Sequence, residues 1–401
     1  MKKIVVIGAG QAGVALCAKL RASGFDGTLD LIGKETAPPY QRPPLSKGYL
    51  LGDMATDRLS LRAPSFYKDN DINLHLGKAV QGIDANSKKV DLGNRTLSYD
   101  ALALTTGATA RPLPAQIGGD LVGVYTVRNL HDVDMMRAEF VAGASVVIIG
   151  GGYIGLEAAA VAKKLGLDVT VIEMAPRILQ RVAAKQTSDY FRALHQSHGV
   201  KIIEGVGIDR LSGEIRVASA LLTDGRTLRA DFVIAGVGIY PNVELAANRG
   251  LHIDNGIATD ILGQCSDAHI WSAGDCASFI YQGQRIRIES VQNAIDQAEN
   301  AAANMLGAAQ PYEPLPWFWS DQFDCKLQIA GLNNGYDAVV ARGHSGGAQS
   351  FWYFKGEALL AVDAMNDPRA FMVAKRILAG SIGVDKAIVA DETFDLKKLL
   401  K

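Results

Sequence analysis

The same glycine motif occurs twice in this chain of 401 residues, each time between a short apolar run and an Ala-rich stretch. The first copy, GAGQAG at residues 8–13, follows the apolar residues 4–7. The second, GGGYIG at residues 150–155, follows the apolar residues 146–149. The apolar runs have the length of buried strands, and the Ala-rich stretches are helical in pattern. Each copy therefore predicts the strand, turn and helix that begin a dinucleotide-binding βαβ unit.

Each glycine of the motif has its own steric reason. The first allows the tight turn, the second lets the backbone approach a pyrophosphate, and the third lets the helix pack on the strand, with the phosphates at the helix N-terminus. These positions are Gly8, Gly10 and Gly13 in the first copy and Gly150, Gly152 and Gly155 in the second. One copy alone is weak evidence, but two copies in the same context predict two bound dinucleotides.

A carboxylate follows the second apolar run of each βαβ unit. Glu173 ends that run after the second motif, at the spacing of a side chain that accepts hydrogen bonds from ribose hydroxyls. Because it would repel a 2′-phosphate, it favours NADH, although Arg177 and Arg181 leave NADPH open. Glu35 follows the first motif at a longer spacing. It is a ribose candidate there, with a plain surface position as an equal alternative.

An acid also distinguishes the second motif from the first. Glu157 follows Gly155 by two positions, where the first copy has Ala15. A nucleotide-binding fold does not by itself require an acid at this position. We therefore interpret Glu157 as a site residue near the nicotinamide or a flavin, and the alternative is an exposed glutamate on a helix.

Four further segments fall at predicted turns or strand ends. They are PYQRPPLSK at residues 39–47, TTGA at 105–108, GVGIYPN at 236–242 and WSAGDCA at 271–277. The last of them presents Asp275 from a tight turn. Taken one at a time, such segments are more often structural than functional.

Metal and disulfide sites are not predicted. The four cysteines, Cys17, Cys265, Cys276 and Cys325, lie far apart, without CxxC or paired metal-ligand spacing. His195 and His198 are close in sequence, but no acid or cysteine completes a metal site around them. We predict that both histidines lie on the surface.

The charge balance of the chain excludes several partners. It has 41 basic and 42 acidic residues and a net charge of -1, so no overall field attracts nucleic acid or an anionic membrane. No apolar run is long enough to cross a bilayer, so we expect no membrane span. Glycines interrupt the apolar N-terminal stretch where a strand would turn into a helix, so we expect no signal peptide and a cytoplasmic location.

Together and in this order, these motifs resemble the FAD-dependent pyridine nucleotide-disulfide oxidoreductase superfamily over essentially the whole chain. PYQRPPLSK, GGGYIGLE and AGDCA, with RIESVQNAIDQA at residues 287–298 and WFWSDQFDCKLQIAG at 317–331, are similar to segments of ferredoxin reductases of oxygenase systems. Disulfide reductases of the superfamily need a redox-active cysteine pair, and this chain has none. The resemblance therefore implies an external electron acceptor.

The resemblance also implies a fold and its domains. The expected class is α/β, with two Rossmann-like dinucleotide-binding domains of the glutathione-reductase-like kind and a C-terminal α+β interface domain. The expected FAD-binding domain is discontinuous and comprises residues 1–108 and 237–309. The NAD-binding domain comprises residues 109–236, and the interface domain residues 310–401.

A set of site residues follows from the resemblance. Lys47 and Glu157 match the family's Lys–Glu pair beside the flavin, and we assign the catalytic roles to them. The residues matched to FAD are Gly8, Gly10, Gly13, Glu35, Arg42, Lys47, Thr106, Gly107, Arg111, Asp275, Val291 and Trp319. Those matched to NAD are Gly150, Gly152, Tyr153, Ile154, Gly155, Glu157, Glu173 and Gly238. Residues 289–293 are expected to begin a helix directed at the flavin.

The implied activity is reduction of FAD by NADH, followed by single-electron transfer to a [2Fe-2S] ferredoxin that serves a cytochrome P450 or a ring-hydroxylating dioxygenase. Arg285, Arg287, Lys397 and Lys398 are candidate contacts for an acidic ferredoxin, or ordinary solvated charges. A rubredoxin reductase or NADH oxidase on the same scaffold, and a signalling flavoprotein of the apoptosis-inducing-factor type, remain alternatives. We expect a monomer with no nucleic-acid or membrane partner.

Overall fold

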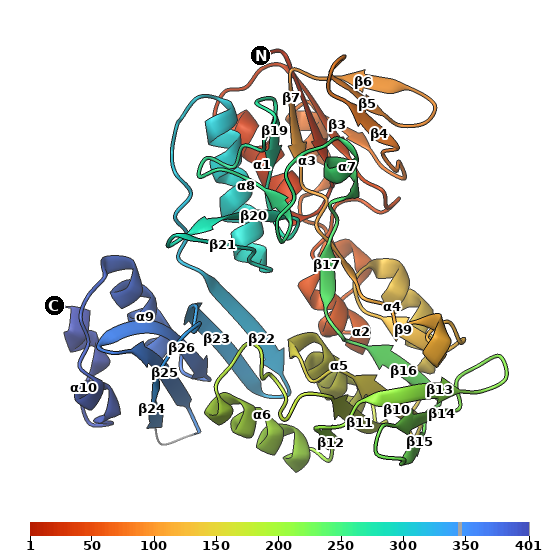
Figure 1. The fold of residues 1–401 in the computed structure, drawn as a ribbon, viewed down its shortest axis with the longest axis vertical. Coiled ribbons are helices and arrows are strands. Elements are labelled where there is room, and N and C mark those ends of the chain that lie inside the picture. Colours follow the sequence, from red (N-terminus) through yellow and green to blue (C-terminus); the bar gives the residue numbers. More distant parts are fainter. Residues whose placement is uncertain (344–346, 401) are drawn as a thin grey trace. The chain divides into compact units, whose positions relative to one another are not determined.

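The structure, a computed structural model, describes residues 1–343 and 347–400 and divides into two compact units (Figure 1). Unit 1 comprises Met1–Arg42, Ala55–Thr109 and Tyr240–Pro314. Unit 2 comprises Pro43–Met54, Ala110–Ile239 and Leu315–Lys401. Each glycine motif belongs to a different unit, so each unit is described in turn.

Unit 1 is built on a parallel sheet of five short, apolar strands. Their order in the sheet is β19-β7-β1-β2-β3, with bounds Ile270–Ser272, Ala101–Leu104, Lys3–Ile7, Thr28–Ile32 and Ile72–His75. Ala-rich helices α1 (Gln11–Ala22) and α8 (Val291–Met305) pack together in one core cluster with side chains of β1 and β2. Small side chains permit this close packing, and it fixes where both helices begin.

Smaller elements complete unit 1. Two antiparallel or mixed sheets have the orders β4-β5-β6 and β18-β20-β21. Their bounds are Gly82–Asp84, Lys89–Asp91, Thr96–Ser98, Ile257–Ala258, Ala277–Tyr281 and Gln284–Ile286. The remaining helices are η2 (Thr56–Leu59), α3 (Pro64–Asp69) and α7 (Glu244–Asn248). The chain leaves unit 1 through β8 (Ala108–Ala110) and returns through β17 (Ile239–Pro241).

Unit 2 repeats the parallel design around the second motif. The sheet order is β12-β11-β10-β16-β9, with bounds Lys201–Glu204, Asp168–Glu173, Ser145–Ile149, Phe232–Ala235 and Val124–Thr126. Helices α4 (Leu130–Met136), α5 (Tyr153–Lys164) and α6 (Lys185–Ser197) accompany it. The other elements are η1 (Pro43–Ser46), α2 (Gly48–Leu51), η3 (Ala115–Ile117), η4 (Arg137–Glu139), β13 (Ile208–Ser212), β14 (Ser219–Leu222) and β15 (Thr227–Arg229).

An antiparallel sheet forms the C-terminal part of unit 2. Its order is β22-β23-β26-β25-β24, with bounds Trp317–Gln322, Cys325–Gly331, Ala358–Met365, Gln349–Lys355 and Ala338–Gly343. Helices α9 (Pro368–Gly380), α10 (Lys386–Ala390) and η5 (Leu396–Leu400) follow it. Phe191 of α6 and Leu156 of α5 share a core cluster with residues of β23, β25 and β26. The parallel and antiparallel sheets of unit 2 are thus joined through one hydrophobic core.

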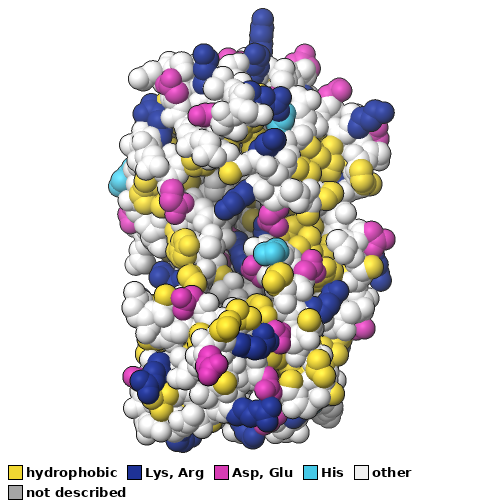
Figure 2. Space-filling view, turned by 90° about the vertical axis from the view of Figure 1, so that its right-hand side faces the viewer, with side chains coloured by type: hydrophobic (Ala, Val, Ile, Leu, Met, Phe, Trp, Pro, Cys, Tyr) yellow, Lys and Arg dark blue, Asp and Glu magenta, His cyan; other side chains and the backbone are white. Residues whose placement is uncertain are grey.

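The predicted fold class is confirmed. Each glycine motif connects the central strand of a five-stranded parallel sheet to a helix, β1 to α1 and β10 to α5, and an α+β part follows at the C-terminus. Among the described helices, none has both the length and the hydrophobicity that a membrane span requires. Over the face drawn in Figure 2, basic and acidic side chains are scattered among each other, in keeping with the balanced composition.

Candidate functional site

The glycine loop of unit 1 forms an open cradle at the start of α1. Gly8 has a φ of +115°, and a Cβ atom on it would lie 2.1 Å from the carbonyl oxygen of Thr105. A Cβ on Gly13 would lie 1.9 Å from the Gly8 oxygen. In contrast, nothing lies within 4 Å of the Cβ position of Gly10, the N-cap of α1. The outer two glycines thus serve close packing, and the middle one leaves space beside the helix N-terminus.

The loop of unit 2 divides its glycines in the same way. Gly150 has a φ of +108°, and its Cβ would lie 2.4 Å from the oxygen of Gly236. A Cβ on Gly155 would lie 2.1 Å from the oxygen of Gly150, whereas that of Gly152, the N-cap of α5, meets no atom within 4 Å. A phosphate needs backbone N–H groups at a helix N-terminus and room to approach them. Both loops provide these features, so the residues fit a dinucleotide in each unit.

The two predicted ribose carboxylates have different surroundings. Glu173 ends β11, and its two oxygens accept hydrogen bonds from the backbone N–H groups of Gly151 and Ala175, each 2.8 Å long. It is therefore held against the glycine loop. Glu35 accepts hydrogen bonds from the Tyr40 hydroxyl at 2.5 Å and the Arg42 guanidinium at 2.7 Å. The structure thus brings together Glu35 and Arg42, two of the residues matched to FAD.

Arg177 and Arg181 are the two arginines that could bind the 2′-phosphate of NADPH. The guanidinium of Arg177 donates to the hydroxyl of Ser188 and to the carbonyl of Ala183, the latter at 2.8 Å. It is therefore committed to holding the chain before α6. Arg181 is exposed, with its Nη2 atom 3.9 Å from the Cβ position of Gly238. Of the two arginines, Arg181 is thus the one that can reach a ligand from this side.

Thr106 and Gly107 are linked to a distant segment of unit 1 by a residue that the sequence did not single out. Thr106 donates to the carbonyl oxygen of Asn242 at 2.7 Å, and the Asn242 side chain donates back to the Thr106 oxygen at 2.8 Å. The backbone N–H of Asn242 donates to Gly107 at 2.9 Å. Asn242 is the last residue of the GVGIYPN segment. Its place in this strand-end segment is the sequence signal that could have identified it.

The Asp275 turn and the start of α8 lie beside the first glycine loop. A Cβ on Gly274 would lie 3.0 Å from the Cβ of Ala12 in α1, and the N–H of Gly274 donates to Gln297 of α8 at 2.9 Å. Val291 is the first residue of α8, whose N-cap Ser290 accepts from the N–H of Asn293 at 3.1 Å. Unit 1 thereby gathers Gly10, Asp275 and Val291 from distant parts of the chain.

Arg111 and Gly238 are neighbours in unit 2. The N–H of Arg111 donates to the carbonyl oxygen of Gly238 at 2.9 Å.

Tyr153 and Ile154 begin α5, but their side chains diverge. The Tyr153 ring packs on Phe318 with 4.9 Å between centroids and its hydroxyl is buried, whereas Ile154 is 41% exposed. The Tyr153 hydroxyl is therefore turned into the protein, whereas the Ile154 side chain faces solvent.

Lys47 and Glu157 form an ion pair within unit 2. The Lys47 ammonium lies 3.1 Å from Glu157 Oε1, and the side chain of Glu157 comes from the inner face of α5. Ser46 donates to Oε2 at 2.7 Å, and Ser320 of β22 donates to Oε1 at 2.6 Å. Glu157 is only 5% exposed, so the exposed alternative is wrong. Burial raises the pKa of this carboxyl, while Lys47 and the two hydroxyls oppose the rise.

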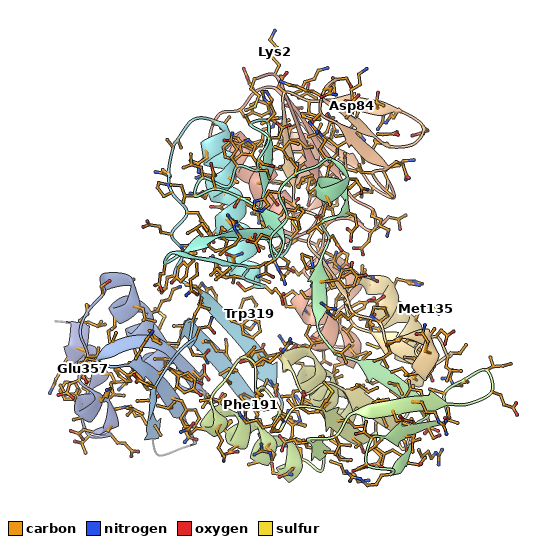
Figure 3. The ribbon with its side chains drawn as sticks, viewed as in Figure 1. Lys2, Asp84, Met135, Phe191, Trp319 and Glu357 are labelled. Atoms are coloured by element: carbon orange, nitrogen blue, oxygen red, sulfur yellow. The ribbon has the colours of Figure 1, made fainter. Side chains whose placement is uncertain are left out.

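Trp319 lies on β22 (Figure 3). It directly precedes Ser320, which donates to Glu157. Its ring centroid is 5.6 Å from that of Trp317, and the ammonium of Lys375 lies 4.7 Å from the Trp317 ring centroid. This part of β22 therefore carries an aromatic pair with a neighbouring cation.

The prediction that His195 lies on the surface is wrong. Its side chain is fully buried, and its Nε2 atom lies 2.8 Å from Gln322 Oε1. His198 is exposed, as predicted, and stacks on Phe323. The four cysteines are buried free thiols, and among the described residues no group of three or more His, Cys, Asp or Glu is arranged to hold a metal ion.

Two of the candidate ferredoxin contacts are occupied within unit 1. Arg287 pairs with Glu289 at 2.6 Å, and its side chain is only 10% exposed. Arg285 donates to the carbonyl oxygens of Ser278 at 2.9 Å and Thr259 at 3.1 Å. Both guanidinium groups therefore serve the local fold, whereas Lys397 and Lys398 are exposed on η5.

Comparisons with known proteins match this arrangement from end to end. The family model described as pyridine nucleotide-disulphide oxidoreductase matches residues 2–298, and one described as reductase C-terminal matches residues 317–400. The chain is 42% identical to rhodocoxin reductase of Rhodococcus erythropolis, over 98% of this chain and 93% of that protein. It is 40% identical to putidaredoxin reductase of Pseudomonas putida, over 99% and 96% of the two chains.

A solved structure agrees equally well. The reductase chain in the crystal structure of the covalent putidaredoxin reductase–putidaredoxin complex superposes with a TM-score of 0.96. It is 39% identical to this chain, and the match covers 100% of this chain and 98% of that one.

Proposed function

Because the chain belongs to the pyridine nucleotide-disulphide oxidoreductase family, we propose that it is an FAD-dependent NADH:ferredoxin oxidoreductase. Its electron acceptor is a [2Fe-2S] ferredoxin that serves a cytochrome P450 or a ring-hydroxylating dioxygenase. The observation that carries this proposal is the pair of equivalent glycine cradles, one in each unit, each with open space at its middle glycine. One holds a resident dinucleotide and the other an exchanging one.

We assign the cradle of unit 1 to FAD. Gly8, Gly10 and Gly13 receive its pyrophosphate at the start of α1, and Glu35 with its partner Arg42 faces the ribose. The other residues of the FAD set that belong to unit 1 are Thr106, Gly107, Asp275 and Val291. Lys47, Arg111 and Trp319 stay predictions from the resemblance. The N-terminus of α8 adds a positive helix end, which stabilises negative charge.

We assign the cradle of unit 2 to NADH. Gly150, Gly152 and Gly155 receive the coenzyme pyrophosphate, with Tyr153, Ile154 and Gly238 bordering it. Glu173 already accepts two backbone hydrogen bonds and is fixed in place, so its charge stands where a 2′-phosphate would be repelled. This arrangement supports NADH over NADPH. Arg181 is the residue whose positive charge could attract a 2′-phosphate and so weaken the preference for NADH.

A bound flavin would supply the redox chemistry, because it can accept two electrons together and release them one at a time. The protein supplies position and charge. Glu157 and Lys47 hold each other in an environment with little water, so the pair presents a fixed carboxylate and a fixed ammonium to ligands of unit 2. The proposed reaction needs no protein nucleophile and no cysteine pair. The four cysteines are buried free thiols, which supports an electron acceptor outside the chain.

The proposal includes the domain bounds, the location in the cell and the oligomeric state. We infer an FAD-binding domain of residues 1–108 and 237–309, an NAD-binding domain of 109–236 and an interface domain of 310–401. Free thiols are typical of a reducing compartment, which supports a cytoplasmic location. A monomer suits a reductase that must expose one edge of its flavin to a small carrier.

The test is NADH-dependent reduction of cytochrome c by the purified holoenzyme with and without a [2Fe-2S] ferredoxin. We expect turnover to require the ferredoxin. Rapid oxygen consumption that ignores the ferredoxin would favour an NADH oxidase, and turnover with rubredoxin alone would favour a rubredoxin reductase.

A further inference from the structure

A continuous line of buried hydrogen bonds runs from Glu157 to His195. Ser320 donates to Glu157 Oε1 at 2.6 Å, the Gln322 amide nitrogen donates to Ser320 at 3.1 Å, and Gln322 Oε1 lies 2.8 Å from His195 Nε2. All four side chains are buried: Glu157 is 5% exposed and the other three 0%. Burial therefore shields the line from bulk water, and each bond constrains the next.

The carboxylate sets the direction of every bond in this line. The single hydroxyl proton of Ser320 is donated to Glu157, so Ser320 can only accept from Gln322. Gln322 must then turn its NH₂ group toward Ser320 and its oxygen toward His195. That oxygen requires a donor, which is the Nε2–H of His195. With the opposite amide orientation, Ser320 would give its proton to Gln322 and the buried carboxylate would lose a donor.

His195 is suited to be a neutral donor. Burial lowers the pKa of its imidazole to about 4, and Nδ1 is buried without a hydrogen-bond partner among the described atoms. A proton on Nδ1 would have no acceptor, whereas one on Nε2 has Gln322. The ring also packs edge-on against Phe323, with 5.0 Å between centroids. These contacts hold the ring in one orientation and one tautomer.

The alternation of β22 explains how the line is built. Ser320 and Gln322 point to the buried side of the strand, while Asp321 between them is exposed and lies 3.8 Å from the Lys47 ammonium. The charged and titratable groups near the line include Lys47 and Asp321 at the Glu157 end. Cys325 lies opposite Gln322 on β23, and the Lys164 ammonium donates to the carbonyl oxygen of Phe323 at 3.1 Å. His198 lies at the other end, beside α6.

We propose that Ser320, Gln322 and His195 are positioning residues that align Glu157 and keep it ionised through a one-way relay of donated hydrogen bonds. The inference rests on the proposed function, in which Glu157 acts on the bound coenzyme. Ser46 and Lys47 hold the carboxylate from one side, and the relay holds it from the other. Loss of a relay donor shifts the equilibrium toward protonated Glu157, because an ionised acceptor depends most on its donors.

The first test measures the pH dependence of flavin reduction by NADH in stopped-flow experiments. In His195→Leu and Gln322→Leu holoenzymes, we expect the acidic limb of the rate to move up by about one pH unit. His195→Gln, whose amide can donate the same bond, should recover most of the shift. His198→Ala is the matched control just beyond the same helix and should leave the profile unchanged. In a Glu157→Gln background, the relay variants should have no further effect on the profile.

The second test needs neither coenzyme turnover nor a folded variant. NMR of the wild-type protein labelled with ¹⁵N-histidine should show one buried imidazole that stays neutral from about pH 6 to 9 with its proton on Nε2. A cationic His195, or a proton on Nδ1, would overturn the relay. Equal effects of His195→Leu in the wild-type and Glu157→Gln backgrounds would overturn it too. If NADH fails to reduce the wild-type flavin, the proposed function fails, while the histidine spectrum still decides the relay.

Discussion

The Lys47 ammonium and Glu157 Oε1 lie 3.1 Å apart, joining the PYQRPPLSK segment to the helix that follows the second glycine motif. Because Glu157 is buried, removal of either partner leaves an unpaired charge or an unfilled site inside unit 2. We therefore expect the rate of flavin reduction by NADH to depend on this pair.

Neutralising this carboxylate should slow flavin reduction without releasing FAD. For Glu157→Gln and Glu157→Ala we expect the rate of flavin reduction by NADH to fall on the order of 10- to 100-fold, because the fixed negative charge beside Lys47 is lost. Stopped-flow absorbance measures this rate, and the visible flavin spectrum after gel filtration measures retention. Glu357→Ala, at an exposed position in the C-terminal part (Figure 3), is the control. An unchanged rate in both Glu157 variants would remove this residue from the site.

Coenzyme selectivity should depend on the carboxylate at the end of β11. We expect Glu173→Gln to lower the preference for NADH over NADPH by about tenfold or more, because the repulsion of a 2′-phosphate is removed. The measurement is the ratio of kcat/KM for the two coenzymes. Asp168→Asn, at the opposite end of the same strand, should leave the ratio as it is. If Glu173→Gln gives the same ratio as the parent, the ribose assignment is wrong.

The glycines of one loop should respond differently to alanine. Gly152→Ala fills open space at the N-terminus of α5, so we expect normal stability and a higher KM for NADH. Gly155→Ala places a methyl group against the Gly150 oxygen, so we expect a loss of about 1–3 kcal/mol in the free energy of unfolding. Chemical denaturation and steady-state kinetics measured on both variants separate the two effects. Equal losses of stability would show that the middle glycine is also structural.

A buried carboxyl in the core of unit 2 should make stability depend on pH. Asp363 accepts hydrogen bonds from Thr187 at 2.7 Å and from the hydroxyl of Tyr353. Burial raises its pKa to about 6, against the opposing effect of these bonds. The folded state then holds the proton more tightly than the unfolded state, so its contribution is complete below about pH 4 and is lost as the pH rises through about 6. The loss corresponds to at most about 3 kcal/mol.

Denaturation of the wild type and Asp363→Asn at several pH values tests this sign. The difference in unfolding free energy between them should change between about pH 4 and 6 and be flat above about pH 7. Asp209→Asn, at an exposed position, is the control. A difference that does not vary with pH would mean that Asp363 titrates alike in the folded and unfolded chain.

Ferredoxin reduction should weaken when the charge of the C-terminal helix is reversed. Lys397 and Lys398 are exposed on η5, which packs through Leu396 against the core beneath α9. With Lys397→Glu and Lys398→Glu combined, we expect ferredoxin reduction to slow about tenfold at low ionic strength and by less at high salt. Flavin reduction by NADH should not change. An equal rate of ferredoxin reduction at low salt would place the docking surface elsewhere.

Local constraints made the glycine cradles predictable from the sequence. A strand, a tight turn and a helix follow one another directly along the chain, and the structure has them at both motifs. The contact between Lys47 and Glu157 was expected only through the resemblance, because the two residues are far apart in sequence, yet it is present.

The relay behind Glu157 could not be predicted in this way. Ser320 and Gln322 reach the site through the register of β22, and His195 through the packing of α6 on the C-terminal sheet. A polar residue on an amphipathic helix carries no local sign of such burial, so sequence reasoning places His195 on the surface. The low exposure of Arg287 beside Glu289 was not predictable for a related reason, because it depends on how β21 turns into α8.

The central claim is that electrons from NADH leave this protein one at a time for a [2Fe-2S] protein. Anaerobic single-turnover mixing tests it most directly: holoenzyme reduced with one equivalent of NADH is mixed with excess oxidised ferredoxin, and the iron–sulfur absorbance is followed. We predict rapid reduction of two ferredoxin molecules for each NADH, because a hydride carries two electrons. A flavin that stays reduced in the presence of the ferredoxin and is reoxidised only when oxygen is admitted would contradict the account.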